Sequence, residues 1–503
     1  MNALSRLILT GAIASLTTTL PAATSALWGT HGELWSPASR LPDFSYAGYH
    51  CGEAPLPNPP ASVSLKDFGA VGDGVADDSK AFLKAIATVK SGAIEIPPGR
   101  YRITKIIEIN RPNVVLRGAG PGKTILFFPT PLNDIKPNWG ETTGGMRTSN
   151  YSWSGGLIWF QGNFGSKPLA KITADAQRGE FVLTVSDTSR LSAGQRVEIF
   201  ERDNPDNSLA KELYSGDAGD TRKLEGSTHA TLVCHITRID GHQIHFDRPL
   251  RFAVKAQWHP QIRQFAPTVS ESGVENLTFE FPNTRYGGHF KELGYNAIAF
   301  SGVSDCWACN LVITNADSGI MPGGMFCTIQ DIVFESSREP DKALHCTGHH
   351  GMNFEGADNL FTGFDYRTRF VHDISVDHCA VGNVMANGRG IDLCFDHHER
   401  APSENLFTDI DTGAGTRLWT CGGGDALGKH CGTRGTFWNI RAAKPQTFPP
   451  ASFGPPSMNL VGVQPGIASV TEPNGRWFEA IAPGQLSPPD IHAAQLARRL
   501  GAK

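Results

Sequence analysis

The feature that most constrains the fold of this chain is a short repeated pattern, an Asn or Asp followed by apolar residues at alternate positions. Its occurrences begin at Asn276, Asn310, Asp331, Asp373, Asn405 and Asn439. One coil of a β-solenoid takes roughly 20 residues or slightly more, so each interval fits one coil with a loop, or two coils. Another occurrence, at Asn359, precedes Asp373 by less than one coil, and we expect it on another face of the same coil. The pattern predicts a stack of β-coils.

Glycine and proline supply the corners that such a stack needs. The chain has 55 Gly and 33 Pro among 503 residues, above the average share, and its 40% of hydrophobic residues can fill a long core. Near the N-terminus, apolar residues at helical spacing behind Asp77 or Asp78 predict one helix over 78–90. From Gly92 onward the period changes to two, which predicts short strands separated by turns.

Two regions depart from the repeat. Residues 167–252 hold evenly alternating segments at 181–185, 196–200 and 242–246, which predict a small β insert that forms a lid or a wall of the substrate site. The tail after Pro445 is rich in Pro and Gly, and we expect a short helix at 491–500.

The N-terminal part of the chain carries a recognisable signature. The segment Asp67-Phe68-Gly69-Ala70-Val71-Gly72-Asp73-Gly74 with Asp77-Asp78, followed by Ile96-Pro97-Pro98-Gly99-Arg100-Tyr101, resembles the start of the pectate-lyase-like right-handed parallel β-helix superfamily. That superfamily includes polysaccharide lyases, polygalacturonase-type glycoside hydrolases and phage tailspikes. The resemblance implies an all-β solenoid with an N-terminal capping helix, and it leaves the reaction open because one fold hosts many chemistries.

Together these observations predict one long domain with additions. We expect a signal peptide at 1–26, a Pro-rich lead segment at 27–60, the parallel β-helix at 61–445 with its insert, and a C-terminal extension at 446–503.

The N-terminal segment 1–26 predicts export. Arg6 precedes an apolar run from Leu7 to Leu20, and the small residues up to Ala26 fit cleavage after that position. We therefore expect a secreted or periplasmic protein. No later stretch has the ~18 uninterrupted apolar residues of a membrane span, so none is expected.

Charge and cysteine content narrow the partners and the chemistry. The formal net charge is -4 without a basic stripe, which argues against nucleic acid as a partner. Ten cysteines in an exported chain predict some disulfide bonding, with Cys421–Cys431 as the favoured local bridge. For Cys306 and Cys309, a disulfide or packed thiols are favoured over a metal or redox site.

Histidine is the strongest chemical signal, since eight of the 17 lie between residues 345 and 430. They include two pairs, Gly348-His349-His350-Gly351 and Asp396-His397-His398-Glu399-Arg400. One histidine in a solenoid is usually a packed residue, whereas two pairs flanked by Gly and charges favour a functional role. We treat His349, His350, His397 and His398 as candidate catalytic bases or acids.

Carboxylates and cations near these pairs complete the candidate site. Alternation along Gly390–Asp396 predicts that Ile391, Leu393 and Phe395 point inward and that Asp392 and Asp396 point outward, about 13 Å apart. Those two carboxylates are candidate substrate or Ca²⁺ ligands. Further candidates are Asp317 from a preceding coil as a catalytic carboxylate, Arg389 or Arg400 as a neutralising cation, and Glu399 and Trp419 as substrate contacts.

Short motifs compare differently with the two enzyme classes. Asn315-Ala316-Asp317 and Gly348-His349-His350-Gly351 resemble motifs of polygalacturonase-type hydrolases, but neither the tandem Asp pair nor the R-x-K of that family is present. Phe395-Asp396-His397 and Arg400-Ala401-Pro402 resemble the D-H and R-x-P motifs of pectate lyases. The comparison favours a lyase over a hydrolase.

The chemistry points in the same direction. Elimination from a uronate needs a base for the proton next to the carboxylate, a cation for the developing charge and an acid for the leaving oxygen. The chain supplies His and Arg more generously than paired carboxylates, so we favour a polysaccharide lyase acting on an acidic glycan. A polygalacturonase-like hydrolase and a non-catalytic carbohydrate-binding or structural β-helix remain as alternatives.

Overall fold

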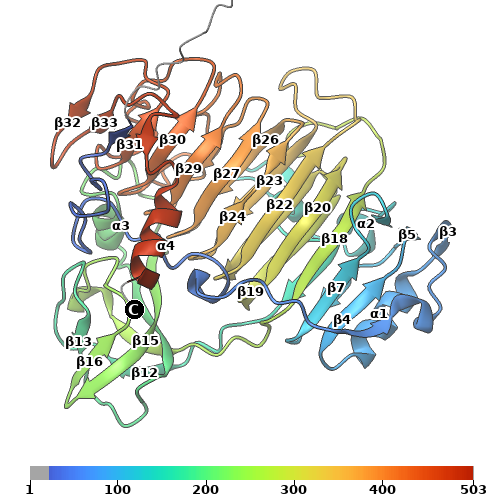
Figure 1. Ribbon diagram of the computed structural model, residues 1–503, viewed down its shortest axis with the longest axis horizontal. Helices are drawn as coiled ribbons and strands as arrows, with labels where there is room; N and C mark the ends of the chain where they lie inside the picture. Colours follow the sequence, from blue (N-terminus) through green and yellow to red (C-terminus); the bar gives the residue numbers. More distant parts are fainter. Residues whose placement is uncertain (1–21, 502–503) are drawn as a thin grey trace, which may run out of the picture.

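The computed structural model describes residues 22–501, and it shows a right-handed parallel β-helix, the predicted fold class. Most of the expected signal peptide lies outside these residues. Within residues 22–501, no helix has the length and apolar character needed to cross a membrane. Figure 1 shows the strands stacked in sequence order from the N-terminal end to the C-terminal end of the solenoid.

One sheet of the solenoid carries the histidines. It has seven parallel strands in the order β28-β26-β23-β21-β19-β11-β6. Their bounds are Phe395–His397 (β28), Phe370–Val376 (β26), Gly348–Phe354 (β23), Ser318–Met325 (β21), Asn296–Ser304 (β19), Ile158–Gln161 (β11) and Ile107–Ile109 (β6).

Long bent strands form the other faces. The first half of β18 pairs with β7 and its second half with β8, so one strand contributes to two faces of the coil. The bounds of the bent strands and their partners are Val114–Gly118 (β7), Thr124–Phe127 (β8), Gly273–Glu280 (β18), Trp307–Thr314 (β20), Thr328–Glu335 (β22), Leu360–Thr362 (β24), Asp365–Tyr366 (β25), Val384–Gly390 (β27), Leu406–Asp411 (β29), Thr436–Arg441 (β30) and Asn459–Val463 (β31).

The repeated Asn and Asp residues mark these bends. Asn276, Asn310 and Asp331 have φ values of 59°, 51° and 56°, and the strand register places them opposite one another. Asn, Asp and Gly adopt this left-handed conformation more easily than other residues. The same column continues, one residue per coil, through Gly363, Asn387, Asp409, Asn439 and Gly462.

Two members of the sequence pattern and the additional Asn359 lie elsewhere. Asn359, Asn383 and Asn405 form a second, buried column in which each side-chain amide donates to the next oxygen, at 2.9 and 3.0 Å. Asp373 lies in β26 on the seven-stranded sheet. The repeated pattern in the sequence therefore includes residues from three different structural positions: the bends, the buried asparagine column and strand β26.

A helix covers the N-terminal end of the core. Helix α1 (Ser79–Thr88) lies within the predicted range and buries Phe82, Ala85 and Ile86. Asp78 is the residue before the helix, but its carboxylate accepts from the backbone N–H groups of Val71 and Gly72 rather than capping α1. Near the other end, α4 (Ile491–Gly501) packs against the outside of β29 and β30.

The β insert is a separate six-stranded antiparallel sheet with its own core. Its strands are β12 (Pro168–Lys171), β17 (Gln261–Gln264), β14 (Arg196–Arg202), β15 (His229–Asp240), β16 (Gln243–Phe246) and β13 (Val182–Thr184), in that order across the sheet. It extends beyond the expected end at 252, because β17 belongs to the same sheet. Figure 1 shows it beside the C-terminal half of the solenoid.

The cysteine prediction is wrong in the structure, where all ten thiols are free. Cys421 lies on the sheet side, with its sulfur 3.3 Å from the backbone nitrogen of His397. Cys431 belongs to the solenoid core, and its sulfur approaches the Gly432 carbonyl instead. The two side chains of the expected bridge therefore have separate packing partners.

Candidate active site

A cleft of about 640 Å³ lies beside the seven-stranded sheet where β23 and β26 bring their histidines together. Trp153 and Phe290 contribute aromatic surface, and Lys223 and Arg400 contribute positive charge. Lys223 comes from the β insert, so the insert forms part of the wall of this cleft. The remaining lining residues are Glu141, Thr142, Thr143, Gly144, His289, His349, His350, Asn353, His372, Asp377, His378, His398, Gly422, Gly423, Gly424, Asp425 and Leu427.

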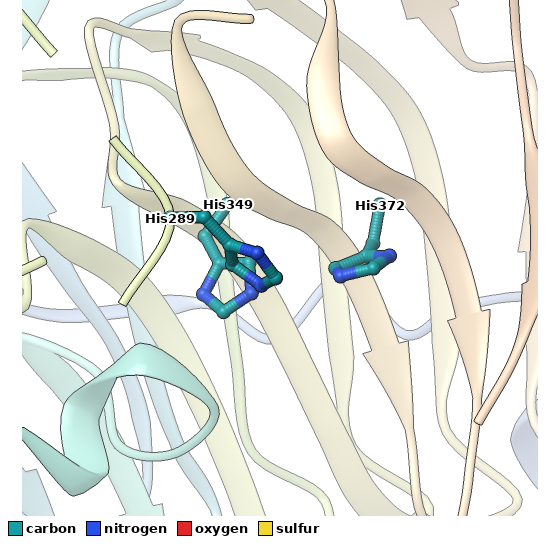
Figure 2. Close-up of side chains that lie close together, drawn as sticks. All are labelled: His289, His349 and His372. Atoms are coloured by element: carbon teal, nitrogen blue, oxygen red, sulfur yellow. The ribbon is translucent and has the colours of Figure 1, made fainter. Parts of the chain in front are cut away.

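Three histidines from different segments meet in this cleft (Figure 2). His349 lies on β23, His372 lies on the neighbouring β26, and His289 comes from the loop between β18 and β19. The ring centres are 4.6 Å apart for His289–His349, 5.3 Å for His349–His372 and 5.5 Å for His289–His372.

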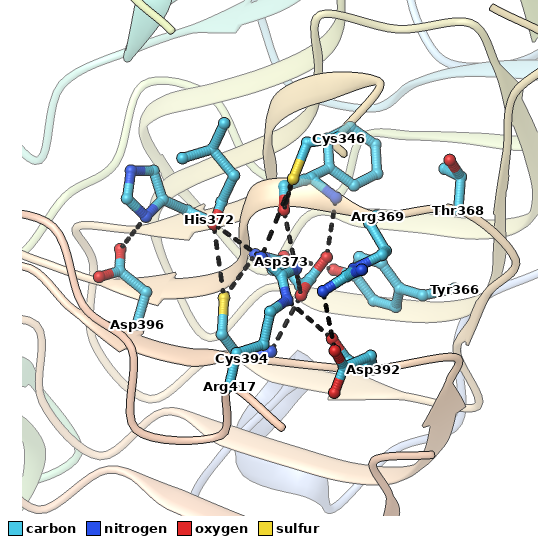
Figure 3. A network of polar contacts seen from close by, with 12 residues as sticks. Cys346, Tyr366, Thr368, Arg369, His372, Asp373, Asp392, Cys394, Asp396 and Arg417 are labelled. Carbon is cyan, nitrogen blue, oxygen red and sulfur yellow. Dashed lines mark hydrogen bonds and ion pairs between the residues drawn. The ribbon is translucent and has the colours of Figure 1, made fainter. Parts of the chain in front are cut away.

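Asp396 joins the histidines into one network. Its Oδ2 lies 2.9 Å from Nδ1 of His398 and 3.3 Å from Nδ1 of His372, the contact drawn in Figure 3. The same oxygen accepts from the Ser375 hydroxyl at 2.7 Å, and Oδ1 accepts from the backbone N–H of Gly422 at 2.7 Å. Because Asp396 is completely buried, these donors replace the water that a carboxylate would otherwise need.

A second chain of contacts leads from Asp396 to His350. Since the Ser375 hydroxyl donates to Asp396, its oxygen is free to accept from His350 Nδ1 at 3.1 Å. The register supports this chain, because Ser375 lies opposite Asp396 and His350 lies opposite His372. His350 then keeps the lone pair of Nε2 for a proton from outside the network.

The network separates the protonation states of neighbouring rings. Burial lowers the pKa of His372 to about 3, and it holds the pKa of His349 and of His350 well below the usual range, with help from nearby histidines. Burial would also lower the pKa of His398, but the Asp396 carboxylate raises it to about 9. The cleft therefore presents neutral imidazoles beside one protonated imidazole at neutral pH.

Glu292 lies behind His349. Its Oε1 is 3.6 Å from His349 Nδ1, and its side chain is completely buried. Tyr286 and Ser152 donate hydrogen bonds to it. Burial raises the pKa of Glu292 to about 7.

The structure brings some of the sequence-predicted residues to the cleft. His349, His350, His398 and Arg400 line it, and Asp396 lies beneath them. His397 does not line the cleft, because its side chain turns into the core. It packs among Phe407, Phe437 and Phe453.

Asp317 and Arg389 also lie outside the residues that line the cleft. Asp317 is buried and pairs with Arg338 at 2.9 Å. Arg389 is 69% exposed on the bent strand β27, where it pairs with Asp365.

The strand predicted over Gly390–Asp396 does not exist as one element. β27 ends at Gly390 and β28 begins at Phe395, so the chain turns a corner between them and Ile391 is 51% exposed rather than inward. Asp392 accepts from Arg369, a contact drawn in Figure 3, and from the hydroxyl of Thr416. Asp392 and Asp396 therefore have separate partners and do not form the expected pair of Ca²⁺ ligands.

Glu399 and Trp419, the two other expected substrate contacts, both contact other parts of the protein. Glu399 accepts from the backbone N–H of Gly424 at 2.9 Å, which supports the loop at the edge of the cleft. Trp419 packs edge-on against Phe437 and Phe453.

Sequence reasoning missed His289, His372 and Lys223. His372 had a usable signal, because it follows His350 by the length of one coil and therefore lies beside it. His289 and Lys223 come from a loop and from the insert, where no repeat gives a register.

Three groups of side chains among the described residues bring possible metal-ligand atoms within 4.8 Å of one another. They are His289, His349 and His372; His372, Asp396 and His398; and Glu355, Asp377 and His378.

A family model matches the N-terminal part of the chain. Residues 62–185 match the family model "Rhamnogalacturonase A/epimerase, pectate lyase-like". This segment ends before the first cleft histidine, so the match does not include the histidines of the site.

Curated relatives match over short segments. The mannuronan C5-epimerase AlgE6 of Azotobacter vinelandii is 31% identical over 141 residues, which is 23% of this chain and 16% of that protein. The pre-neck appendage protein of Bacillus phage B103 is 36% identical over 98 residues, 18% of this chain and 11% of that protein. The matches therefore span less than a fifth of these relatives.

Solved structures align over longer stretches at low identity. The tailspike protein gp49 of Pseudomonas phage LKA1 aligns with a TM-score of 0.44 and 13% identity, over 79% of this chain and 66% of that one. An exopolygalacturonase from Thermotoga maritima aligns with a TM-score of 0.33 and 10% identity, over 76% and 72% of the two chains. The N-terminal signature, the family model that matches residues 62–185 and the coils themselves all support a likeness to the pectate-lyase-like superfamily of right-handed parallel β-helices.

Proposed function

We propose that this protein is an enzyme that cleaves a uronate-containing polysaccharide by β-elimination. The observation that carries the proposal is the arrangement of His350 and His398 around Asp396 at one cleft, with Arg400 and Lys223 on its lining. The cleft is open and presents both aromatic and cationic side chains, which suits an anionic sugar chain.

The contacts assign separate roles to the two histidines. His350 donates through Nδ1 to Ser375, so its Nε2 accepts the proton next to the substrate carboxylate. His398 donates through Nδ1 to Asp396, so its protonated Nε2 gives a proton to the leaving glycosidic oxygen. The ring centres lie 6.1 Å apart, close enough for both rings to reach neighbouring positions of one sugar bound beside them.

Arg400 and Lys223 supply the third requirement. Removing a proton next to a carboxylate places negative charge on that carboxylate, and a fixed cation stabilises this charge. Both side chains line the cleft, one from the solenoid and one from the insert. The hydrolase alternative has less support, because Asp317 is buried against Arg338 and does not line the cleft.

C5-epimerisation is a second candidate, favoured by the match to mannuronan C5-epimerases. It begins with the same proton removal as elimination, and the two reactions diverge only when a proton returns to the carbon or the glycosidic bond breaks. The same His350 and Arg400 would serve both.

The test is incubation of the purified chain with a panel of polyuronates in D₂O. Elimination predicts an ultraviolet-absorbing unsaturated product, and epimerisation predicts deuterium in the sugar without cleavage. His350→Ala and His398→Ala should each lower the rate by about a hundredfold or more, and His31→Ala, at an exposed site, should not. New reducing ends without either signal would identify a hydrolase and refute the proposal.

We also propose that the protein is exported, on the basis of the apolar run from Leu7 to Leu20. Fractionation of cells that express the full chain, with N-terminal sequencing, tests this. The expected mature protein begins after Ala26 and lies outside the cytoplasm, and an intact N-terminus in the cytoplasm would contradict the proposal.

A further inference from the structure

His289, His349 and His372 form a cluster (Figure 2), and each ring has one buried nitrogen without a hydrogen-bond partner. His349 and His372 are 1% and 4% exposed. His289 Nε2, His349 Nδ1 and His372 Nε2 are buried and have no hydrogen-bond partner. A buried polar atom without a partner costs about 1–3 kcal/mol. Because His349 Nδ1 faces the Glu292 carboxylate, the Nε2 atoms of His289 and His372 are the two that call for a ligand that the protein chain does not provide.

The spacing fits a single ion. One ring nitrogen of each histidine lies within 4.8 Å of the other two. Three nitrogens around a tetrahedral ion at ~2.0–2.1 Å are separated by ~3.4 Å, so small ring rotations would complete the set. His289 lies on a loop and can move more easily than the two strand residues.

Carboxylates stand behind two of the three rings. Asp396 Oδ2 is 3.3 Å from His372 Nδ1, which leaves His372 Nε2 for an ion. Glu292 Oε1 is 3.6 Å from His349 Nδ1, which leaves the other nitrogen of that ring. A carboxylate behind a histidine fixes the ring and strengthens its binding to a metal, and both carboxylates offset the charge of a buried cation.

We propose that His289, His349 and His372 bind one transition-metal dication of the Zn²⁺ class, with its remaining position open to the cleft. Three imidazoles suit Zn²⁺, Cu²⁺ or Ni²⁺, whereas Ca²⁺ requires oxygen ligands that this cluster lacks. The overlapping set with Asp396 and His398 is less suitable, because Asp396 already accepts from Ser375, His398 and Gly422. Binding of the metal does not depend on the reaction. A role in neutralising a substrate carboxylate rests on the proposed function.

The experiment uses the purified, chelator-treated chain without a polyhistidine tag. Titration with Zn²⁺ in a calorimeter should give one tight site per chain and a higher melting temperature, since the ion binds only the folded cluster. Co²⁺ should give the visible absorption bands of a tetrahedral site. Ca²⁺ should neither bind tightly nor displace Zn²⁺.

Four variants locate the site. His289→Ala and His372→Ala should weaken Zn²⁺ binding by at least about a hundredfold, and Asp396→Asn should weaken it by about 10- to 100-fold by removing the support of His372. His378→Ala is the matched control, because His378 lines the same cleft outside the cluster and is 50% exposed. Circular dichroism and melting of each metal-free variant show whether it is folded.

Each outcome decides the proposal. Failure of the wild type to bind Zn²⁺, or unchanged binding by both folded His289→Ala and His372→Ala, overturns it. Loss of binding in His378→Ala alone would assign the ion to Glu355, Asp377 and His378 and also overturn it. Because binding is measured without substrate, an inactive protein that binds Zn²⁺ would refute only the proposed function.

Discussion

His397 shows how one strand can supply two environments at adjacent residues. Its neighbours Asp396 and His398 belong to the cleft network, whereas His397 points into the core among three phenylalanines. Its Nδ1 lies 3.0 Å from the Phe395 carbonyl, and its Nε2 has no partner. Burial lowers the pKa of His397 to about 4 from an ordinary 6.5.

This residue should make the fold sensitive to acid. As pH falls below 6.5, the unfolded chain takes up a proton at His397 and the folded protein does not until pH reaches about 4, so stability falls within that window. At about pH 5 the loss is about 2 kcal/mol. His397→Phe removes this loss. When the pH is lowered from about 8 to about 5, the free energy of unfolding of the variant, measured with urea, should therefore rise by about 2 kcal/mol relative to that of the wild type.

The control is the same change at the exposed His31. The difference in unfolding free energy between the two pH values should be the same in this variant as in the wild type. A His397→Phe variant with the same pH dependence as wild type would show that this buried ring does not contribute to acid sensitivity.

At the scale of the element, the bent strands depend on residues that tolerate positive φ. Asn310 lies between β20 residues on two faces, and its side-chain amide donates to Asn276 of the preceding coil at 2.7 Å. The bend is therefore stabilised by backbone tolerance and by a contact between coils.

Two substitutions separate these contributions. Asn310→Gly and Asn310→Ala both remove the amide, but only alanine places a Cβ in the left-handed conformation. Asn310→Ala should be less stable than Asn310→Gly by about 1–2 kcal/mol in denaturant unfolding, although glycine usually weakens a strand. If Asn310→Gly were instead the less stable variant, the conformational entropy that glycine loses in a strand would outweigh the strain of alanine at positive φ.

At the scale of the molecule, buried ion pairs hold the insert against the solenoid. Arg248 and Arg251 follow the insert strand β16, and both pair with Asp358, which precedes β24. All three side chains are 5% exposed or less. Since Lys223 of the insert lines the cleft, this contact also helps to maintain the cleft wall.

Asp358→Asn should leave the buried Arg248 without its carboxylate and Arg251 with only Glu404, 3.8 Å away. We expect a loss of about 3–5 kcal/mol in unfolding free energy and faster proteolysis within the insert, measured by mapping the cleavage sites. Asp240→Asn breaks the exposed pair with Arg238 and should have little effect on either measurement. Equal behaviour of the two variants would mean that the buried pair does not hold the insert.

Much of this architecture could be predicted from local patterns. The Asn and Asp residues before alternating apolar positions predicted the coils, because a bend with positive φ selects few residue types. The apolar spacing behind Asp78 predicted α1, and the alternating segments after 167 predicted the insert. These features depend on close neighbours along the chain, which the sequence displays directly.

The site was harder to predict from the sequence, because its residues are not close neighbours along the chain. The sequence by itself determined the solenoid, its capping helix and the concentration of histidine, since these follow from periodicity and composition. Only the tertiary structure decided that His397 turns into the core, that Asp392 and Asp396 separate at a corner, and that His289 joins His349 and His372. Those outcomes depend on the register between coils and on loop paths, in which residues far apart in the sequence become neighbours.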